Sequence, residues 1–298
     1  MSFDVTSIAT KLEQGADGIW YGKDQQTVSY PDEGHDSCFA IEEKSFWFRH
    51  RNNCILSVIR NFPPDNDGPV FDIGGGNGFV SKFLSESGIQ TVLLEPGPNG
   101  AKNARLRGLK TVVCATTDTA GFVPGSMEGI GLFDVIEHIE DDALFLQTIS
   151  NLLTPGGRVY LTVPAYSFLW SEEDKRAGHY RRYSLRQICS VVRRSGLSVD
   201  YATYIFNFLP LPIFLFRTLP FRIGLNKDSS KVKKQAARDH CTKKGPVSVV
   251  LDKIGKWELR KVSQNKKVAF GGSCLVVATK TARSGSDCRD DDACYYNK

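Results

Sequence analysis

VFDIGGGNGF, residues 70–79, joins a short apolar run to a glycine-rich turn and the first residues of a helical pattern. An apolar run of this length predicts a buried strand, and the glycines after it predict a tight turn. An open α/β sheet binds its ligand at the carboxyl ends of the strands, where such a turn leads into a helix. We therefore expect the functional site of this protein at residues 72–78.

Short apolar runs alternate with helical patterns on both sides of this stretch. Helices are expected at Phe79–Ser87, Asn99–Arg107 and Asp141–Leu153. The expected strands are Val70–Ile73, Thr91–Glu95, Thr111–Cys114, Gly129–Phe133, Arg158–Val163, Ser198–Ile205 and Ser273–Thr279. This order predicts an α/β fold with a doubly wound, Rossmann-like, mostly parallel sheet of seven strands and helices on both faces.

The composition is that of a globular protein. Of 298 residues, 41% are hydrophobic and 24% are charged, which disfavours disordered, collagen-like and polytopic membrane proteins. The 8 cysteines form no CxxC pair, which argues against a zinc ribbon or a dense disulfide framework. The first residues, MSFDVTSIATKLEQ, contain no apolar core of a secretory signal. Together these features predict a cytoplasmic protein with reduced thiols.

The spacing of the glycines distinguishes between two kinds of nucleotide-binding turn. A dinucleotide fingerprint, G-x-G-x-x-G counted from Gly74, would need a glycine where Phe79 stands. The pattern present is D-x-G-x-G-x-G, formed by Asp72, Gly74, Gly76 and Gly78. It resembles motif I of the class I S-adenosylmethionine-dependent methyltransferases. The resemblance implies that these residues bind the cofactor S-adenosylmethionine, with the glycines letting the backbone approach its methionine part.

Three further segments match this family in the expected order. TVLLEPG ends a strand at Glu95 and Pro96, where the family binds the two ribose hydroxyls of the cofactor. GLFDVIEHIEDD implies Asp134 near the cofactor and Glu137 and His138 facing the substrate. LLTPGGRVYLTVP matches the helix, Gly-Gly turn and fifth strand of the family. The resemblance is strong over residues 60–200, and EEKSFWFRHRN, GHYRRYS and FGGSCLVVATK resemble the branch of ubiquinone-biosynthesis O-methyltransferases and type 11 and 12 methyltransferase domains.

One segment departs from the family pattern. Residues 115–125, ATTDTAGFVPG, lack the acidic residue followed by Leu-Pro that lines the adenine, so Asp118 and Phe122 stay open as adenine contacts. Trp47 and Arg49 are candidates to cap the far end of the cofactor. A Phe-Trp-Phe cluster is also typical of an ordinary core.

His138 is the candidate general base. A neutral imidazole near pH 7 can take a proton from an acceptor hydroxyl as the methyl group arrives. The alternative is a loop histidine bonded to the backbone. Asp134, Glu137 and His138 also resemble a metal-assisting acidic cluster of the ubiquinone-type enzymes. Because the segment offers only these three ligands, a bound metal is not expected, and whether a metal assists stays open.

Tyr180, Arg181 and Arg182 are the candidate substrate-binding residues, together with Glu137. Two arginines between tyrosines can hold a phosphate or carboxylate while the rings pack on the rest of the substrate. The alternative is a solvated basic turn with Tyr183 in the core.

An apolar segment and a basic segment lie side by side near the C-terminus. Residues 204–221 are apolar but contain Pro210, Pro212 and Pro220, so they are not expected to span a bilayer. Residues 226–244 hold seven Lys or Arg against Asp228 and Asp239, which accounts for the formal net charge of +5. The pair predicts either a lid on the domain or a hairpin at an anionic membrane interface. The remaining sequence is balanced in charge, so nucleic acid is not expected as a partner.

These features predict an order of segments along the chain. We expect an irregular lead-in over 1–45, a cofactor-binding methyltransferase domain over 46–205 and an apolar and basic insertion over 206–262. A closing strand over 263–280 and a disordered tail over 281–298 follow. The predicted function is O-methylation of a small or lipid-linked acceptor by a cytoplasmic protein, with peripheral contact at the inner membrane surface. The alternatives are a nicotinamide-dependent oxidoreductase and a catalytically silent scaffold that binds cofactor or membrane.

Overall fold

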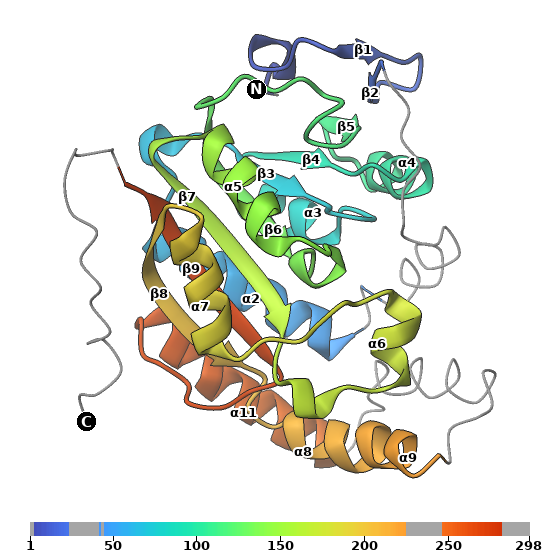
Figure 1. The fold of residues 1–298 in the computed structure, drawn as a ribbon, viewed down its shortest axis with the longest axis vertical. Coiled ribbons are helices and arrows are strands. Elements are labelled where there is room, and N and C mark those ends of the chain that lie inside the picture. The colour runs from blue at the N-terminus through green and yellow to red at the C-terminus, as the bar shows by residue number, and fades with distance from the viewer. Residues whose placement is uncertain (1–2, 24–41, 43–44, 225–245, 282–298) are drawn as a thin grey trace.

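The computed structural model describes residues 3–23, 42, 45–224 and 246–281, and every structural statement below concerns these residues. Figure 1 shows a central twisted sheet with helices on both faces. The basic run over 226–244 and nearly all of the expected tail over 281–298 lie outside the described residues.

The sheet is mixed, with a parallel centre. Its strand order is β1-β2-β5-β4-β3-β6-β7-β9-β8. The strands are β1 (Leu12–Gln14), β2 (Trp20–Gly22), β3 (Val70–Ile73), β4 (Thr91–Leu94), β5 (Val112–Cys114), β6 (Met127–Phe133), β7 (Leu153–Pro164), β8 (Leu197–Ile205) and β9 (Ser273–Lys280). Neighbours from β2 through β7 are parallel, whereas β1–β2, β7–β9 and β9–β8 are antiparallel. The predicted doubly wound, mostly parallel α/β fold is confirmed.

The prediction of seven strands was wrong, because the described residues form nine. The two additional strands lie within the expected irregular lead-in, where β1 and β2 form an antiparallel pair. Trp20 and Tyr21 of β2 pair in parallel with Val113 and Cys114 of β5. Strands of three residues carry too little alternation to be recognised locally. Their pairing with a distant strand decides their conformation.

Helices cover the two faces of the sheet. The helices α2 (Phe46–Asn61), α3 (Phe79–Glu86), α4 (Pro98–Leu106) and α11 (Pro246–Ser263) pack on one face, and α5 (Asp142–Leu152) and α7 (Leu185–Arg194) pack on the other. Shorter helical segments are η1 (Val5–Ser7), η2 (Asp65–Asp67), η3 (Ile136–His138), η4 (Ser167–Leu169) and α6 (Glu172–Ala177). All four residues of β3 are buried because both faces of this strand are covered.

The chain changes direction at β3. From this strand it continues to β4 on one side, and it later returns to add β6 on the other side. The carboxyl end of β3 therefore lies at a topological switch point, where open α/β sheets form a crevice. The glycine turn that follows Ile73 lines this crevice.

The prolines of the apolar segment do not break its backbone. Three short elements, α8 (Pro210–Ile213), η5 (Phe214–Thr218) and α9 (Leu219–Arg222), follow one another with right-handed helical dihedral angles at each junction. The π-helical turn η5 precedes Pro220, whose missing N–H and bulky ring are incompatible with a regular α-helix. In the described part of the chain, no helix has both the length and the apolarity needed to cross a membrane.

The helix α11 lies within the expected insertion over 206–262 and packs on the same face of the sheet as α2. Its Glu258 is fully buried, with Oε1 2.7 Å from His50 Nε2 of α2. The same carboxylate accepts the backbone N–H groups of Phe206 at 2.6 Å and Asn207 at 2.8 Å. Glu258 thus joins α2, α11 and the turn that leads from β8 into α8.

Replacement of Glu258 by Ala should lower the free energy of unfolding by about 3–5 kcal/mol, because His50 and two buried backbone donors lose their acceptor. Urea denaturation of the full chain measures this loss. Asp252→Ala changes an exposed acid of the same helix and should stay within about 0.5 kcal/mol of the unmodified protein. Equal stability of the two variants would contradict the proposed anchoring role.

Candidate active site

A cavity of about 1060 Å³ opens at the carboxyl ends of β3, β4 and β6. Six of the predicted cofactor residues line it, namely Asp72, Gly74, Gly76, Glu95, Pro96 and Asp134. They come from three neighbouring strands, whose carboxyl ends the parallel sheet brings to one edge.

The Glu95 carboxylate holds the glycine turn. Its Oε2 accepts the N–H of Gly76 at 2.8 Å, and its Oε1 accepts the N–H of Gly97 at 2.7 Å. Gly76 has a φ of 55°, a left-handed conformation that suits glycine. Burial raises the pKa of Glu95 to about 7, against the opposing effect of these two N–H groups.

Asp72 adds a second buried acid to this end of the cavity. Its Oδ2 accepts the hydroxyl of Ser81 at 2.7 Å, whereas its buried Oδ1 has no hydrogen-bond partner among the described residues. Burial raises the pKa of Asp72 to about 6. A cationic ligand group at Oδ1 would satisfy this oxygen.

Gly78 does not line the cavity, although the motif predicts a cofactor contact there. It caps α3 with a φ of 73°. A Cβ at this position would lie 2.6 Å from Leu109 Cδ1 and 2.9 Å from Ala104 Cβ. The third glycine of the motif is therefore required for packing against the α4 layer.

Arg51 is a cavity residue that the sequence analysis missed. Its guanidinium forms an ion pair with Asp134 and lies 4.8 Å from the ring centroid of Trp47. Trp47 lines the cavity, but Arg49 is exposed on the other side of the helix and outside the cavity wall. Helical spacing would have indicated Arg51, because it lies four residues after Trp47 and so on the same face.

The two uncertain adenine contacts do not line the cavity. Asp118 is exposed, and Phe122 is buried in the core, where its ring packs against Phe71. Neither residue is part of the cavity wall.

His138 lies in the cavity wall beyond Asp134. Burial and the neighbouring His179 lower the pKa of His138 to about 4, although Asp134 and the carbonyls of Ala177 and Gly178 raise it. The imidazole is therefore neutral at pH 7, but it is a weaker base than an unperturbed histidine. Contact with backbone carbonyls also matches the alternative of a loop histidine.

Glu137 is buried outside the cavity wall, contrary to its predicted position facing the substrate. Burial and the charge of Asp134 raise the pKa of Glu137 well above its ordinary value. Its Oε2 is buried without a hydrogen-bond partner in the described part of the chain.

The structure separates the three remaining predicted substrate residues. Arg182 lines the cavity, whereas Tyr180 is exposed and Arg181 pairs with Asp142 at 2.8 Å, both outside the cavity wall. Arg182 is also engaged, since its Nε donates to Asp174 at 2.7 Å. The predicted pair of arginines that would hold one anion is therefore not formed.

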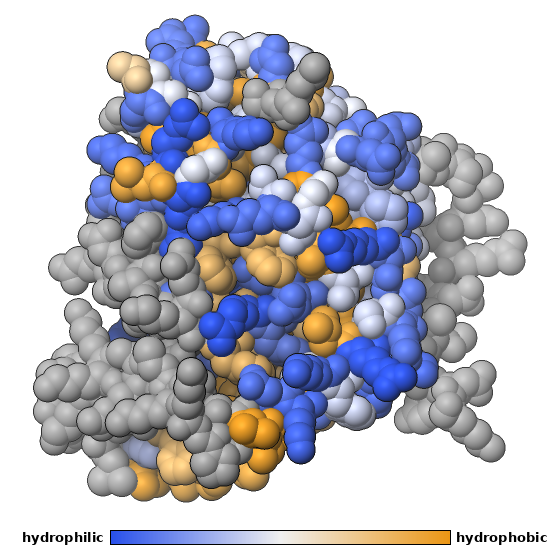
Figure 2. Space-filling model, turned by 180° about the vertical axis from the view of Figure 1, so that it is seen from behind, coloured by the Kyte–Doolittle hydropathy of each residue, from blue (hydrophilic) through white to orange (hydrophobic). Residues whose placement is uncertain are grey.

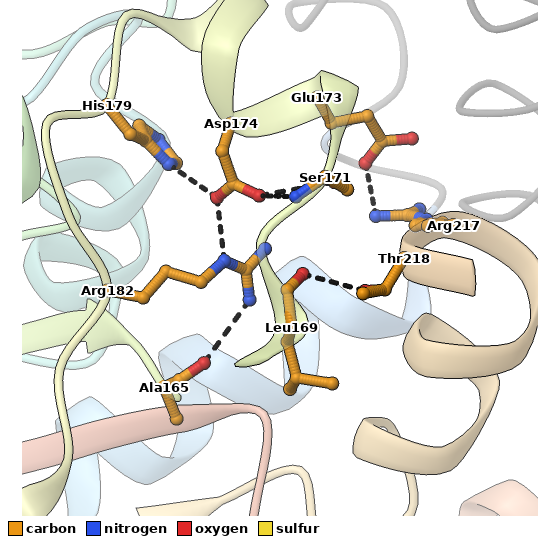
Figure 3. Close-up of polar contacts among 9 residues, drawn as sticks. All are labelled: Ala165, Leu169, Ser171, Glu173, Asp174, His179, Arg182, Arg217 and Thr218. Atoms are coloured by element: carbon orange, nitrogen blue, oxygen red, sulfur yellow. Dashed lines mark hydrogen bonds and ion pairs between the residues drawn. The ribbon is translucent and has the colours of Figure 1, made fainter. Parts of the chain in front are cut away.

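The far wall of the cavity is formed by α6 and by the consecutive elements α8, η5 and α9 (residues 210–222), which we call the α8–α9 helix. Figure 3 shows the contacts between them. Glu173 of α6 forms an ion pair with Arg217, and Thr218 donates its hydroxyl to the carbonyl of Leu169 at 2.9 Å. Apolar side chains complete this wall, namely Phe208, Leu209, Pro212, Ile213 and Phe216. The cavity thus has a polar end at the glycine turn and an apolar end at the helix.

Comparison with known proteins identifies the family. A methyltransferase domain model matches residues 47–202, which is more than half of the chain. The chain belongs to the methyltransferase domain family. With the switch-point topology, this membership makes the protein a class I S-adenosylmethionine-dependent methyltransferase.

Curated relatives of this methyltransferase include ubiquinone biosynthesis O-methyltransferases. The one from Xylella fastidiosa (strain 9a5c) is 28% identical over 138 residues, which are 42% of this chain and 56% of the relative. The one from Xanthomonas oryzae pv. oryzae (strain PXO99A) is 29% identical over 99 residues, 31% of this chain and 41% of the relative. The chain spans about half the length of the curated relatives it matches.

Solved methyltransferase structures share the fold. A chain of the complex between the Haloferax volcanii Trm112 methyltransferase activator and a methyltransferase has a TM-score of 0.55 and 17% identity, covering 86% of this chain and 97% of that chain. Phosphoethanolamine N-methyltransferase 2 of Haemonchus contortus was solved with S-adenosylmethionine. It has a TM-score of 0.52 and 22% identity, and the match covers 86% of this chain and 58% of that chain.

The polar end of the cavity fits S-adenosylmethionine, the cofactor of the class I methyltransferases. The unpartnered oxygen of Asp72 suits the ammonium group of the methionine part. The buried carboxylate of Glu95 has lone pairs for the two ribose hydroxyls. These two acids lie on neighbouring strands, on either side of the glycine turn.

The affinity for S-adenosylhomocysteine should rise about tenfold between about pH 6 and pH 8, as Glu95 ionises with its pKa of about 7. The direction follows because hydroxyl donors need the carboxylate and not the protonated acid. Calorimetric titration over this range measures the effect.

Glu95→Gln should bind more weakly and lose the pH dependence, while the exposed control Glu86→Gln should keep it. An affinity that stays constant with pH in the unmodified protein would rule out this role of Glu95.

Proposed function

We propose that this methyltransferase transfers a methyl group from S-adenosylmethionine to a hydroxyl of an acceptor with a long apolar portion. The observation that carries the proposal is the division of the cavity into a polar cofactor end and an apolar end formed by Phe208, Leu209, Pro212, Ile213 and Phe216. A small polar acceptor would leave these apolar side chains in contact with water.

The residues of the chain supply positioning and proton acceptance. When bound, the cofactor supplies an electrophilic methyl group whose bond to sulfur breaks as the acceptor oxygen bonds to carbon. Asp72, Glu95 and the glycine turn hold the donor end, and the apolar wall orients the acceptor toward it. Holding the two reactants in attack geometry supplies much of the rate enhancement of such a reaction. His138 and His179 lie in the wall and are the candidate proton acceptors.

Two observations favour oxygen as the methylated atom. A hydroxyl loses its proton on methylation, and two imidazoles lie in the cavity wall with ring centroids 4.7 Å apart. The curated relatives are named as O-methyltransferases, although they match only part of their length. The N-methyltransferase neighbour supports the fold alone.

The apolar end of the cavity reaches the molecular surface at an apolar rim. We define this rim as Leu211, Leu215, Phe216, Leu219 and Ile223, whose side chains are between 39% and 66% exposed. Figure 2 shows apolar atoms along the lower edge of the molecule, where α8 and α9 lie. The basic run over 226–244 follows the rim directly in the sequence. We infer that the rim contacts an anionic membrane surface and receives a lipid-linked acceptor there.

Dodecylcatechol with S-adenosylmethionine should yield its methyl ether and S-adenosylhomocysteine, while dodecylamine should not be methylated. Mass spectrometry of the products tests the atom and the lipophilic class together. NADH should not bind, because Phe79 occupies the third glycine position of a dinucleotide fingerprint. Retained affinity for S-adenosylhomocysteine without turnover of any hydroxyl acceptor would instead identify a silent scaffold.

The full chain should co-sediment with anionic vesicles, bind neutral vesicles less, and be released as salt rises, because screening shortens the reach of exposed charges to about 8 Å. Replacing Leu211 and Leu215 together by Glu should weaken binding by at least about tenfold, since each leucine side chain contributes about 1.5–3 kcal/mol when fully buried. The matched control replaces Leu106 and Leu144, two leucines exposed on other helices, by Glu. Equal effects of the two double variants would contradict the membrane contact.

A further inference from the structure

An aspartate–histidine pair lies in the cavity wall, formed by residues that the sequence analysis did not combine. Asp174 Oδ1 lies 2.9 Å from His179 Nδ1, and both residues line the cavity. Figure 3 shows the imidazole of His179 directed at this carboxylate, with Arg182 approaching the same oxygen from the other side.

The residues at the two ends of α6 position this pair. Ser171 and Asp174 form a capping box at the start of α6, with Asp174 Oδ2 accepting the Ser171 N–H at 2.8 Å. Gly178 ends the helix with a left-handed φ of 74°, and the N–H of His179 then donates to the carbonyl of Asp174 at 2.9 Å. The side chain of His179 is thereby folded back onto the acid of its own helix.

The pair has a defined proton arrangement. Burial would raise the pKa of Asp174, but the hydrogen bond from His179 and the interactions with Arg182 lower it to about 2. Asp174 is therefore ionised and has only acceptors, so Nδ1 of His179 carries the proton of their hydrogen bond. The lone pair of a neutral His179 is then on Nε2, at the opposite edge of the ring.

We infer that His179 Nε2 accepts the proton of the acceptor hydroxyl, with Asp174 orienting the ring and stabilising the imidazolium. This inference rests on the proposed O-methyl transfer. The acceptor oxygen forms a bond to the methyl carbon, the carbon–sulfur electron pair stays on sulfur, and the hydroxyl proton moves to His179 and then to water. The products are the methyl ether, S-adenosylhomocysteine and one proton.

The surroundings distinguish His179 from His138. Among the described residues, the charged and titratable groups near His179 include Asp174, which Arg182 also contacts, and Glu137 and His138, whose ligand atoms lie within 4.8 Å of a ring nitrogen of His179. His179 has the ionised partner, whereas His138 is held near the carbonyls of Ala177 and Gly178 and has its pKa lowered to about 4 by burial and by His179. His179 is therefore the histidine whose ring is oriented by an ionised carboxylate, with Nε2 left as its acceptor atom.

Kinetics with dodecylcatechol compare His179→Ala with His138→Ala. His179→Ala should lower kcat by about 10²–10⁴, keep the affinity for S-adenosylhomocysteine within about twofold, and lose the acidic limb of the pH–rate profile. Added imidazole, or a pH high enough to ionise the catechol, should restore part of the rate. His138→Ala should retain the acidic limb. A His179→Ala variant that neither imidazole nor high pH restores would overturn the inference and indicate a structural role.

Three further measurements test this inference. Nitrogen NMR of the full chain with S-adenosylhomocysteine should show neutral His179 protonated at Nδ1, and the opposite tautomer would overturn the inference whichever acceptor is used. Asp174→Asn should move the acidic limb to lower pH, with its thermal unfolding recorded to verify folding. Activity abolished by EDTA and restored by Mg²⁺ would overturn the inference, since Glu137, His138 and His179 would then act by binding a metal ion. Failure of the unmodified protein to methylate dodecylcatechol would count against the proposed function.

Discussion

Buried carboxylates need hydrogen-bond donors. The positions of the side chains and turns around the cavity of this protein depend on how that requirement is met. Removing a carboxylate from water without partners costs several kcal/mol, so each buried acid organises the groups around it. Glu95 orders the glycine turn, Asp134 holds Arg51, Asp174 holds His179, and Glu258 fixes the turn between β8 and α8. Buried acids thus position groups at both ends of the cavity and in the wall between them.

The buried acids have different roles in the site. Asp72 and Glu95 have their pKa raised by burial and keep acceptor capacity for a ligand, since Asp72 Oδ1 has no partner among the described residues. Asp174 has its pKa lowered to about 2 and is saturated by protein donors. The first two suit recognition of a polar cofactor, and the third suits orientation of a histidine. Environment, and not residue type, separates these roles.

The apolar end of the cavity depends on two further contacts of the α8–α9 helix. The α8–α9 helix is held to α6 by the Arg217–Glu173 ion pair and to η4 by the hydrogen bond from Thr218 to the carbonyl of Leu169, so its apolar side chains are available for contacts on both sides. Phe216 takes part in the cavity wall and in the exposed rim. An acceptor with an apolar chain could thereby remain in contact with protein from the membrane surface to the reacting atom, which connects the proposed chemistry to the proposed location.

The sequence by itself determined the parallel sheet, the glycine turn and the position of Glu95, because these depend on local patterns of apolar residues and glycines. It did not determine β1 and β2, whose three-residue strands form by pairing with distant segments. It also singled out Arg49 and His138, and it did not single out Arg51 and His179. Helical spacing from Trp47 could have placed Arg51 on the cavity face. The ion pair of Arg51 with Asp134, 83 residues away, and the fold of α6 that turns His179 back to Asp174 have no such local signal. Only the tertiary structure decided them, since burial and the satisfaction of a charge are properties of the packed chain and not of its neighbours in sequence.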